Sequence, residues 1–100
     1  MKTYFVYILT NHINSVFYIG VTNNLTRRIS IHRSKNQVSF TSKYNIYKLV
    51  YYERFSSIYN AIGREKQLKK WKRKWKVDLI LSLNPEIKDL LNDPYFGIGI

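Results

Sequence analysis

The chain has 100 residues, of which 45% are hydrophobic and 16% aromatic, so it can bury one compact core and is too apolar for a disordered tail. It has no cysteine, which excludes disulfide scaffolds and thiolate metal sites and favours a cytoplasmic protein. A net charge of +11 favours nucleic acid as a partner, although a basic protein whose charge only serves solubility is the plainer alternative.

Three short runs of aromatic and β-branched residues predict strands, at residues 4–9, 16–21 and 47–55. The polar connection between the first two suits a hairpin, so these strands should pair antiparallel. The first run stops before Thr10, which makes it too short for a signal peptide or a membrane span. We therefore expect a small sheet and no membrane segment.

A helix should follow the second strand. Asn23 or Asn24 can cap it, and apolar residues then recur at helical spacing, which predicts a helix from about residue 24 to about residue 35. Polar residues follow in the segment 34–42, which we expect to be a loop.

A second helical pattern follows the third strand, with Ser56 or Ser57 as its cap. It continues past Lys76, which is too long for one helix in so small a domain, so we expect a break near residues 70–73. The helix after the break should stop before Pro85, because the residue preceding a proline disfavours helical geometry. One face of that helix should carry three large apolar residues, Trp75, Leu79 and Leu83.

The domain should comprise residues 1–84, because no linker or repeat interrupts this part of the chain. Residues 85–100 should form a C-terminal extension with a short apolar pattern at Ile87, Leu90 and Leu91. We expect the last residues of this extension to be loose.

Glu65 lies on the apolar face of the predicted helix after Ser57. A carboxylate directed toward a core needs a compensating cation, so Glu65 should form a buried ion pair with an arginine or bind a divalent metal ion. Glu53 is the other carboxylate in residues 1–76, which hold 16 Lys and Arg. A metal site in this part would therefore hold one hydrated Mg²⁺ or Mn²⁺ ion, completed by a substrate phosphate.

Basic and aromatic residues supply the other candidates for chemistry. Arg28 and His32 stand four residues apart and can reach one phosphate together, whereas a lone histidine is more often a surface residue. Tyr7 and Tyr18 occupy matching places in the paired strands, and most of the nine tyrosines should only pack. Surrounding cations and a metal ion would lower the pKa of such a tyrosine and allow it to act as a general base.

Nucleic-acid contacts should come from a basic segment at residues 64–76, which holds eight Lys or Arg. Its candidate contact residues are Arg64, Lys69, Lys70, Lys72, Arg73 and Lys76. On the first helix, Arg27 and Arg33 should contact the phosphate backbone or remain solvated. Trp71 and Trp75 could stack on an unpaired base, although tryptophans at helical spacing are more often core residues.

Several of these residues form motifs in one order along residues 3–84. Phe5-Val6-Tyr7, Tyr18-Ile19-Gly20, Arg28, His32 and Glu65 resemble the pattern of the GIY-YIG nuclease superfamily, and most closely its small single-domain bacterial branch. The departure is Phe5, which stands where the first motif usually has glycine. The resemblance implies an α+β fold with a three-stranded antiparallel sheet flanked by helices.

The resemblance also assigns roles to individual residues. It implies that Tyr7 is the general base toward the attacking water and that Glu65 is the one protein ligand of the metal ion. Tyr18 and His32 would orient the water, and Arg28 would bind the scissile phosphate. Gly20 would leave room for backbone or substrate to approach, and Asn84 would correspond to a late asparagine of some members.

The resulting hypothesis is a metal-dependent endonuclease that hydrolyses DNA and leaves a 3′-hydroxyl end, the last feature being implied by the resemblance. Single-stranded, nicked or branched DNA suits so small a surface better than long duplex, and RNA stays open. No small-molecule cofactor is expected. The alternatives are a catalytically silent nucleic-acid-binding module and an interaction protein that docks acidic partners through residues 64–76.

Overall fold

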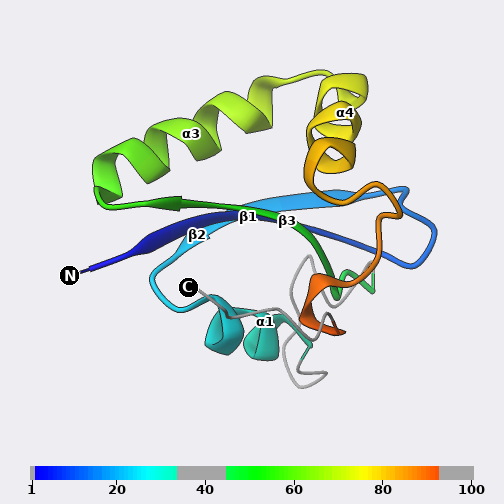
Figure 1. Cartoon of the computed structure of the whole chain (residues 1–100), viewed down its shortest axis with the longest axis horizontal. Helices are drawn as coiled ribbons and strands as arrows, with labels where there is room; N and C mark the ends of the chain where they lie inside the picture. The colour runs from blue at the N-terminus through cyan, green and yellow to red at the C-terminus, as the bar shows by residue number, and fades with distance from the viewer. Residues whose placement is uncertain (1, 34–44, 93–100) are drawn as a thin grey trace.

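The computed structural model describes residues 2–33 and 45–92, with the side chains of all of these except His32 and Arg33. In these residues a pair of strands is followed by a helix, a third strand and two further helices, and a short 3₁₀ turn comes last (Figure 1). The elements are β1 (Tyr4–Thr10), β2 (Phe17–Thr22), α1 (Leu25–Arg33), β3 (Lys48–Phe55), α3 (Ile58–Lys70), α4 (Arg73–Leu83) and η1 (Leu90–Asn92). This is the α+β fold with a three-stranded antiparallel sheet that the sequence predicted.

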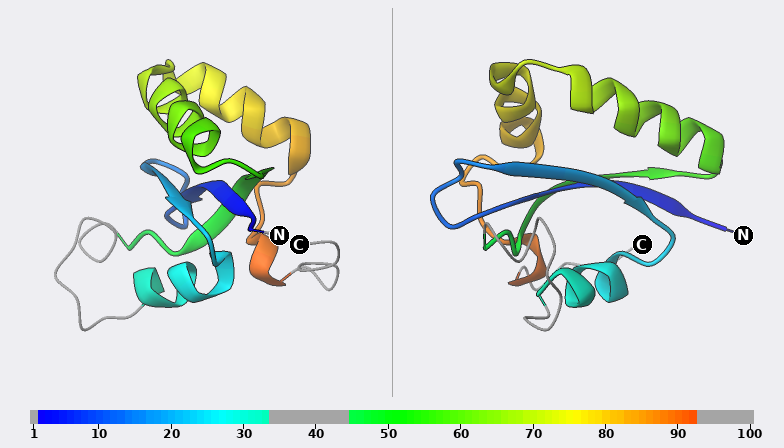
Figure 2. Two further views of the ribbon diagram at one scale, coloured as in Figure 1. Left: turned by 90° about the vertical axis from the view of Figure 1, so that its left-hand side faces the viewer. Right: turned by 180° about the vertical axis from the view of Figure 1, so that it is seen from behind.

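Strand β1 lies at the centre of the sheet, whose order is β2-β1-β3 with both neighbours antiparallel. Helix α1 covers one face of the sheet, and α3 and α4 cover the other (Figures 1 and 2). A central strand covered on both faces has no solvent side, which explains why β1 is an almost continuous apolar run. Strand β2 is left as an edge whose outer side is unpaired.

Alternation along β1 divides the core into two clusters, one on each face of the sheet. Tyr7 and its odd-numbered neighbours pack with Leu25 and Ile29 of α1. Val6 and Ile8 point the other way and pack with residues of α3 and α4. Tyr7 is therefore part of the core on the face of the sheet that α1 covers.

Helix boundaries follow the predicted capping residues. The side chain of Asn24 accepts a hydrogen bond from the backbone N–H of Arg27 at 3.1 Å, and that of Ser57 accepts one from Asn60 at 3.4 Å. The predicted break is confirmed, since α3 ends at Lys70 and α4 begins at Arg73. The predicted end of α1, near residue 35, and the predicted polar loop at residues 34–42 both lie outside the described residues.

The apolar face predicted for α4 is partly buried. Leu79 packs against the core, whereas Trp75 and Leu83 are each 49% exposed, and the neighbouring Ile80 is fully buried against the sheet. The prediction of where this helix stops is confirmed, because α4 ends at Leu83 and Asn84 caps it. Helical spacing shows which residues share a face, and the direction from which α4 approaches the sheet decides how much of that face is buried.

The side chain of Asn84 is buried, with 2% of its surface exposed, and it hydrogen-bonds to the backbone of neighbouring segments. Its side-chain N–H groups donate to the carbonyls of Val50 at 3.2 Å and Lys88 at 2.7 Å, and its side-chain oxygen accepts from the N–H of Lys88 at 3.2 Å. These bonds tie the end of α4 to β3 and to the segment that follows. That segment continues the core, since Leu90 of η1 is buried in the cluster on the α1 face. Residues 93–100 lie outside the described part of the chain.

Candidate active site

Tyr7 and Gly20 lie opposite each other in the β1–β2 ladder. A Cβ atom added to Gly20 would lie 2.6 Å from Cζ of Tyr7 and closer still to its hydroxyl oxygen. The Tyr7 ring therefore lies across Gly20, with its hydroxyl toward the β2 edge of the sheet. The room left by this glycine is filled by Tyr7, which corrects the expectation that backbone or substrate approaches there.

Tyr18 lies beside Tyr7 on the same face of the sheet. Its ring centroid is 6.3 Å from that of Tyr7, and the two rings are tilted by 36°. Tyr18 is only partly buried, whereas the side chain of Tyr7 has no exposed surface. The pair therefore leads from the core to the surface.

Arg28 connects helix α1 to both tyrosines. Its guanidinium forms hydrogen bonds with the side chains of Tyr7 and Tyr18, and the interaction with Tyr7 is the main cause that raises the pKa of Arg28. Arg28 is exposed, so its guanidinium can also contact a ligand that approaches from solvent. The backbone of His32 lies one turn further along α1, and its side chain is outside the described part of the structure.

Glu65 comes from helix α3, on the opposite side of the sheet from α1. Its side chain is 20% exposed, and one carboxylate oxygen lies 3.6 Å from the ammonium nitrogen of Lys69. The carboxylate also lies near enough to raise the pKa of Tyr7. Of the two expectations for Glu65, the ion pair with an arginine is not formed within the described residues, where its ion-pair partner is Lys69.

Burial decides the protonation of Tyr7. It is the largest influence and raises the pKa of this tyrosine to about 12, and the hydrogen bond from Arg28 offsets only part of that effect. The sequence predicted a lowered pKa in the presence of surrounding cations and a metal ion together; without the metal ion, burial outweighs the effect of Arg28. Tyr7 is neutral near pH 7 in this state.

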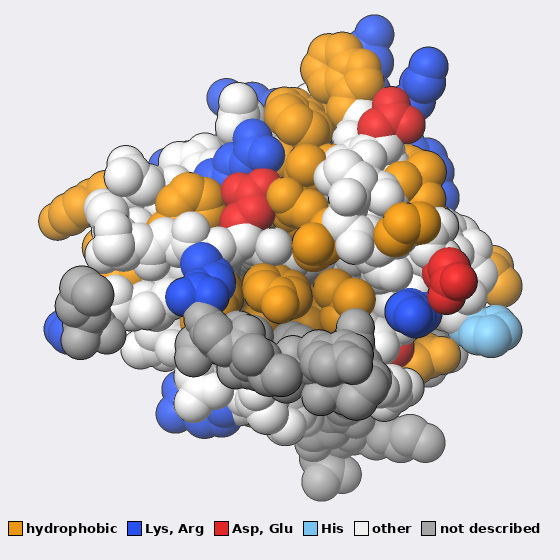
Figure 3. All heavy atoms as spheres, viewed as in Figure 1, with side chains coloured by type: hydrophobic (Ala, Val, Ile, Leu, Met, Phe, Trp, Pro, Cys, Tyr) orange, Lys and Arg blue, Asp and Glu red, His pale blue; other side chains and the backbone are white. Residues whose placement is uncertain are grey.

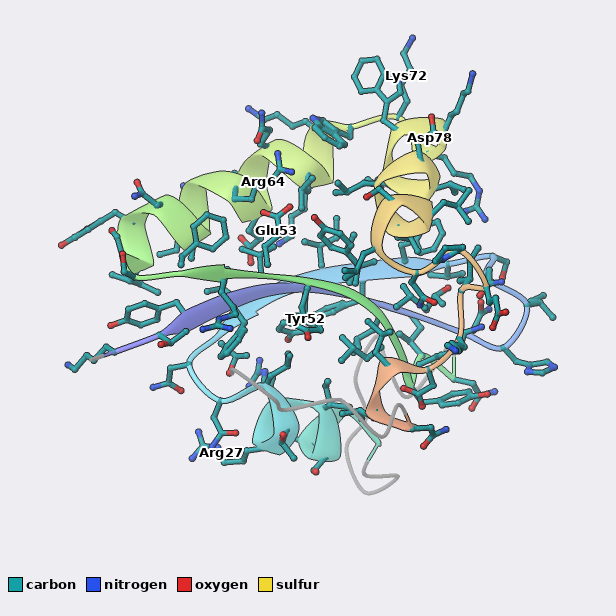
Figure 4. All side chains as sticks on the ribbon, viewed as in Figure 1. Arg27, Tyr52, Glu53, Arg64, Lys72 and Asp78 are labelled. Carbon is teal, nitrogen blue, oxygen red and sulfur yellow. The ribbon has the colours of Figure 1, made fainter. Side chains whose placement is uncertain are left out.

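Glu53 of β3 and Arg64 of α3 form an ion pair between the sheet and the helix. Arg64 Nε and Nη2 donate to the Glu53 carboxylate, each at 2.9 Å in its shortest contact, and the Tyr51 hydroxyl donates to Oε2 at 2.5 Å. Burial opposes ionisation of Glu53, but these hydrogen bonds outweigh it and lower the pKa. Figure 4 shows the pair between α3 and the sheet, on the side away from Tyr52. Sequence spacing gave no signal for this pairing.

Two arginines of the basic segment have structural partners. Arg64, besides its contacts with Glu53, donates to Gln67 at 2.8 Å and stacks 5.1 Å from the centre of the Trp71 ring. Arg73 donates to the carbonyls of Asn14 and Ser15 in the β1–β2 connection, and its guanidinium lies 4.8 Å from the Phe17 ring. Arg64 and Arg73 were predicted to contact DNA, and the structure gives both a packing role.

Lysines of the basic segment remain directed to solvent. Lys69, Lys70 and Lys72 are exposed and Lys76 is half-buried. Figure 3 shows lysine and arginine side chains projecting over the α3–α4 connection, and Lys72 in Figure 4 points away from the sheet. Arg27 is exposed on α1, on the far side of the sheet.

The donor set suits one hydrated divalent ion better than a metal cluster. Within the described residues, no group of three or more His, Cys, Asp or Glu side chains could hold a metal ion. Glu65 offers a partly exposed carboxylate whose charge acts on Tyr7. One carboxylate, completed by water and a substrate phosphate, is a coordination that Mg²⁺ accepts.

Comparison with known proteins shows the family of this chain. The family model of the GIY-YIG catalytic domain matches residues 3–78. The chain belongs to the GIY-YIG family. This domain places it in a nuclease superfamily, and the residues that meet at the β2 edge lie within the matched region. The matched region also includes the whole basic segment, residues 64–76.

Relatives of this GIY-YIG chain are small bacterial proteins. A UPF0213 protein of Clostridium perfringens is 40% identical over 78% of this chain and 83% of its own length. A UPF0213 protein of Staphylococcus haemolyticus is 35% identical over 80% of this chain and 96% of its own. The solution NMR structure of a UPF0213 protein from Bacillus halodurans has a TM-score of 0.56 and 25% identity, covering 95% of this chain and 97% of that one.

The described helices are short for a membrane-spanning segment. Within residues 2–33 and 45–92, no helix is long and apolar enough to cross a membrane. The three α-helices described here all pack on the sheet of the GIY-YIG domain.

Two glycine substitutions should have opposite effects on stability. Gly20→Ala should destabilise the fold by about 1–3 kcal/mol, because the new methyl group displaces the buried Tyr7 ring. Gly63→Ala should stabilise it by about 0.5–1 kcal/mol, because Gly63 lies within α3 and a Cβ there meets nothing within 4 Å. Chemical denaturation of both variants checks this. Equal stability of the two would contradict the packing described for Tyr7.

Proposed function

We propose that this GIY-YIG chain is a divalent-metal-dependent endonuclease that hydrolyses phosphodiester bonds in DNA. The observation that supports the proposal most strongly is the meeting of Tyr7, Tyr18, Arg28 and Glu65 near one edge of the sheet. These residues come from four elements on both faces of the sheet. Packing alone does not require a base, a cation and a carboxylate together at one place.

Glu65 is the residue proposed to hold the metal ion, either Mg²⁺ or Mn²⁺. The ion would supply Lewis-acid stabilisation of the negative charge that develops on the phosphate oxygens. Lys69 compensates the Glu65 charge in the protein without metal, at a distance of 3.6 Å. Because Lys69 is exposed and flexible, it can leave this carboxylate when a stronger cation binds.

Arg28 and His32 are proposed to bind the scissile phosphate. Arg28 already hydrogen-bonds to both tyrosines, so a phosphate on its exposed side would lie close to their hydroxyls. Charge that grows on the phosphate during attack would then face a fixed guanidinium. Tyr18, half-buried at the surface, is suited to orient the attacking water.

Tyr7 is proposed as the general base. It must ionise to take a proton from water, and Arg28 is the group in place that favours its ionised form. Attack of the water oxygen on phosphorus forms one P–O bond and breaks the bond to the 3′ oxygen. That oxygen then takes up a proton and leaves as a 3′-hydroxyl.

Single-stranded, nicked or branched DNA is the proposed substrate class. Lys69, Lys70, Lys72 and Lys76 would meet phosphates along the α3–α4 connection, and Arg27 and Arg33 would do so on α1. Trp75 is 49% exposed beside Lys72, whose ammonium lies 5.5 Å from its ring, so it can stack on an unpaired base.

A cleavage assay tests the proposal. Metal-free protein should leave labelled single-stranded, duplex, branched and RNA oligonucleotides intact, and Mg²⁺ or Mn²⁺ should start cleavage that EDTA stops. Cleavage in EDTA would overturn the metal requirement. Tight binding without cleavage under any condition would instead identify a catalytically silent nucleic-acid-binding module.

A further inference from the structure

A pocket with a volume of about 300 Å³ opens at the outer edge of β2. Its lining residues are Phe17, Tyr18 and Ile19 of β2, with Lys69 of α3 and Lys76 of α4. Phe17 and Ile19 point to the α3–α4 face of the sheet, where Lys69 and Lys76 lie, whereas the Tyr18 ring points to the α1 face. The pocket therefore offers one aromatic ring and two ammonium groups, and no carboxylate is among its lining residues. A partially apolar hollow with positive charge at its rim suits a ligand that has a flat ring and an anionic group.

The pocket borders the candidate active site through Lys69, which lines it and also lies 3.6 Å from the Glu65 carboxylate. Tyr18 also lines the pocket from β2, while its side chain bonds with Arg28 on the α1 face of the sheet. A ligand in the pocket would therefore lie beside Glu65, the proposed metal ligand.

Contacts from α4 hold the outer wall of the pocket in place. Arg73 stacks on the Phe17 ring at 4.8 Å and hydrogen-bonds to the Asn14 and Ser15 carbonyls just before β2. These contacts fix the start of β2 relative to α4, which also carries Lys76. The pocket is thus formed before any ligand binds, which lowers the entropic cost of binding.

We propose that this pocket binds the nucleotide next to the cleaved bond, with its base against the Phe17 ring and its phosphate between Lys69 and Lys76. The inference rests on the proposed nuclease function, to which it adds a subsite. A base in a duplex is stacked on both faces, so it can enter such a pocket only after leaving the helix. The subsite therefore selects an unpaired strand.

Binding of thymidine 5′-monophosphate to ¹⁵N-labelled protein in EDTA tests the subsite without metal or cleavage. We expect shifts of the backbone amides of Phe17, Tyr18 and Ile19, and smaller shifts with inorganic phosphate or with thymidine alone. Shifts centred on another part of the protein would overturn the proposal. Equal shifts with inorganic phosphate would also overturn it, since they would show a phosphate site that does not recognise the base.

Charge-matched variants separate the pocket from general electrostatic attraction. Lys69→Ala/Lys76→Ala removes both pocket ammonium groups, and Lys66→Ala/Lys74→Ala removes two exposed lysines of the same helices outside the pocket. The pocket variant should weaken mononucleotide binding about tenfold more than its control. It should also weaken a short single strand more than a duplex of the same length. Equal losses in the two double variants would overturn the proposal.

The two proposals fail in different ways. Mononucleotide shifts at β2 in a protein that cuts nothing would support the subsite and remove the nuclease function. Metal-dependent cleavage that is equally fast on paired and unpaired strands, with no shifts at β2, would support the nuclease and overturn the subsite.

Discussion

Glu65→Gln should lower the rate of DNA cleavage by at least about a thousandfold. The amide keeps the size and shape of the carboxylate but cannot supply the negative charge that holds a divalent ion. Its side chain is 20% exposed and its ion pair with Lys69 spans 3.6 Å, so the fold should lose less than about 1 kcal/mol. Cleavage of a labelled oligonucleotide at saturating Mn²⁺ measures the rate.

Two other carboxylates provide controls for this substitution. Glu86→Gln changes an exposed carboxylate beyond α4 and should leave both rate and stability unchanged. Glu53→Gln breaks the hydrogen bonds with Arg64 and Tyr51, so it should lower stability and leave the rate per folded molecule near that of the wild type. A Glu65→Gln enzyme that cleaves within tenfold of the wild type would contradict the assignment of Glu65 as metal ligand.

Tyr7→Phe should lower the cleavage rate by about 10²–10⁴-fold and should remove most of its dependence on pH. The base works in its ionised form, and the pKa of Tyr7 is raised to about 12. Below that pKa the ionised fraction grows tenfold for each unit of pH. The wild-type rate at low substrate concentration should therefore rise with pH, with a slope near +1 on a logarithmic scale from about pH 7 to about pH 9.5.

Tyr52→Phe is the matched control for Tyr7→Phe. Tyr52 lies directly opposite Tyr7 on the other neighbouring strand, and it packs against the same core cluster. Loss of its hydroxyl should leave both the rate and its rise with pH unchanged. If Tyr7→Phe kept the wild-type slope, the ionisation would belong to another group and Tyr7 would not be the base.

Ionisation of Tyr7 should also change the free energy of unfolding, which should fall when pH rises far enough to ionise this tyrosine. The folded-state pKa of Tyr7 lies above the ordinary value of 10.0, so folding favours the neutral phenol. This contribution to stability is complete below about pH 10 and is lost as pH rises toward about 12. The fold should therefore keep this contribution throughout the range from about pH 7 to about pH 9.5 in which the rate rises, and lose it only above about pH 10.

The sequence predicted the elements of the fold because their signals are local. Capping by Asn24 and Ser57 and the break after Lys70 follow from residues that are adjacent in the chain. The ion pair of Glu53 with Arg64 joins β3 to α3, and no spacing rule connects residues on different elements. Spacing likewise places Trp75, Leu79 and Leu83 on one face of α4, but how much of that face is buried depends on how the helix meets the sheet.

For the candidate site, the motif resemblance pointed to Tyr7, Tyr18, Arg28 and Glu65 as a set. In the structure Arg28 hydrogen-bonds with both tyrosines, and the charge of Glu65 acts on Tyr7. The depth of burial of Tyr7 could not be obtained from the sequence, because it depends on how α1 packs on the sheet. The sequence predicted that cations and a metal ion together would lower the pKa of Tyr7, whereas desolvation in the core raises it when no metal ion is bound.

Helix α1 carries Arg28 but has only two fully buried side chains among those described, Leu25 and Ile29. So few anchors allow this helix to detach transiently while the sheet and the α3–α4 layer stay folded. Each detachment would take the guanidinium away from both phenols. Heat should consequently inactivate the protein several degrees before the sheet melts, and an apolar substitution that anchors α1 more firmly should close that gap.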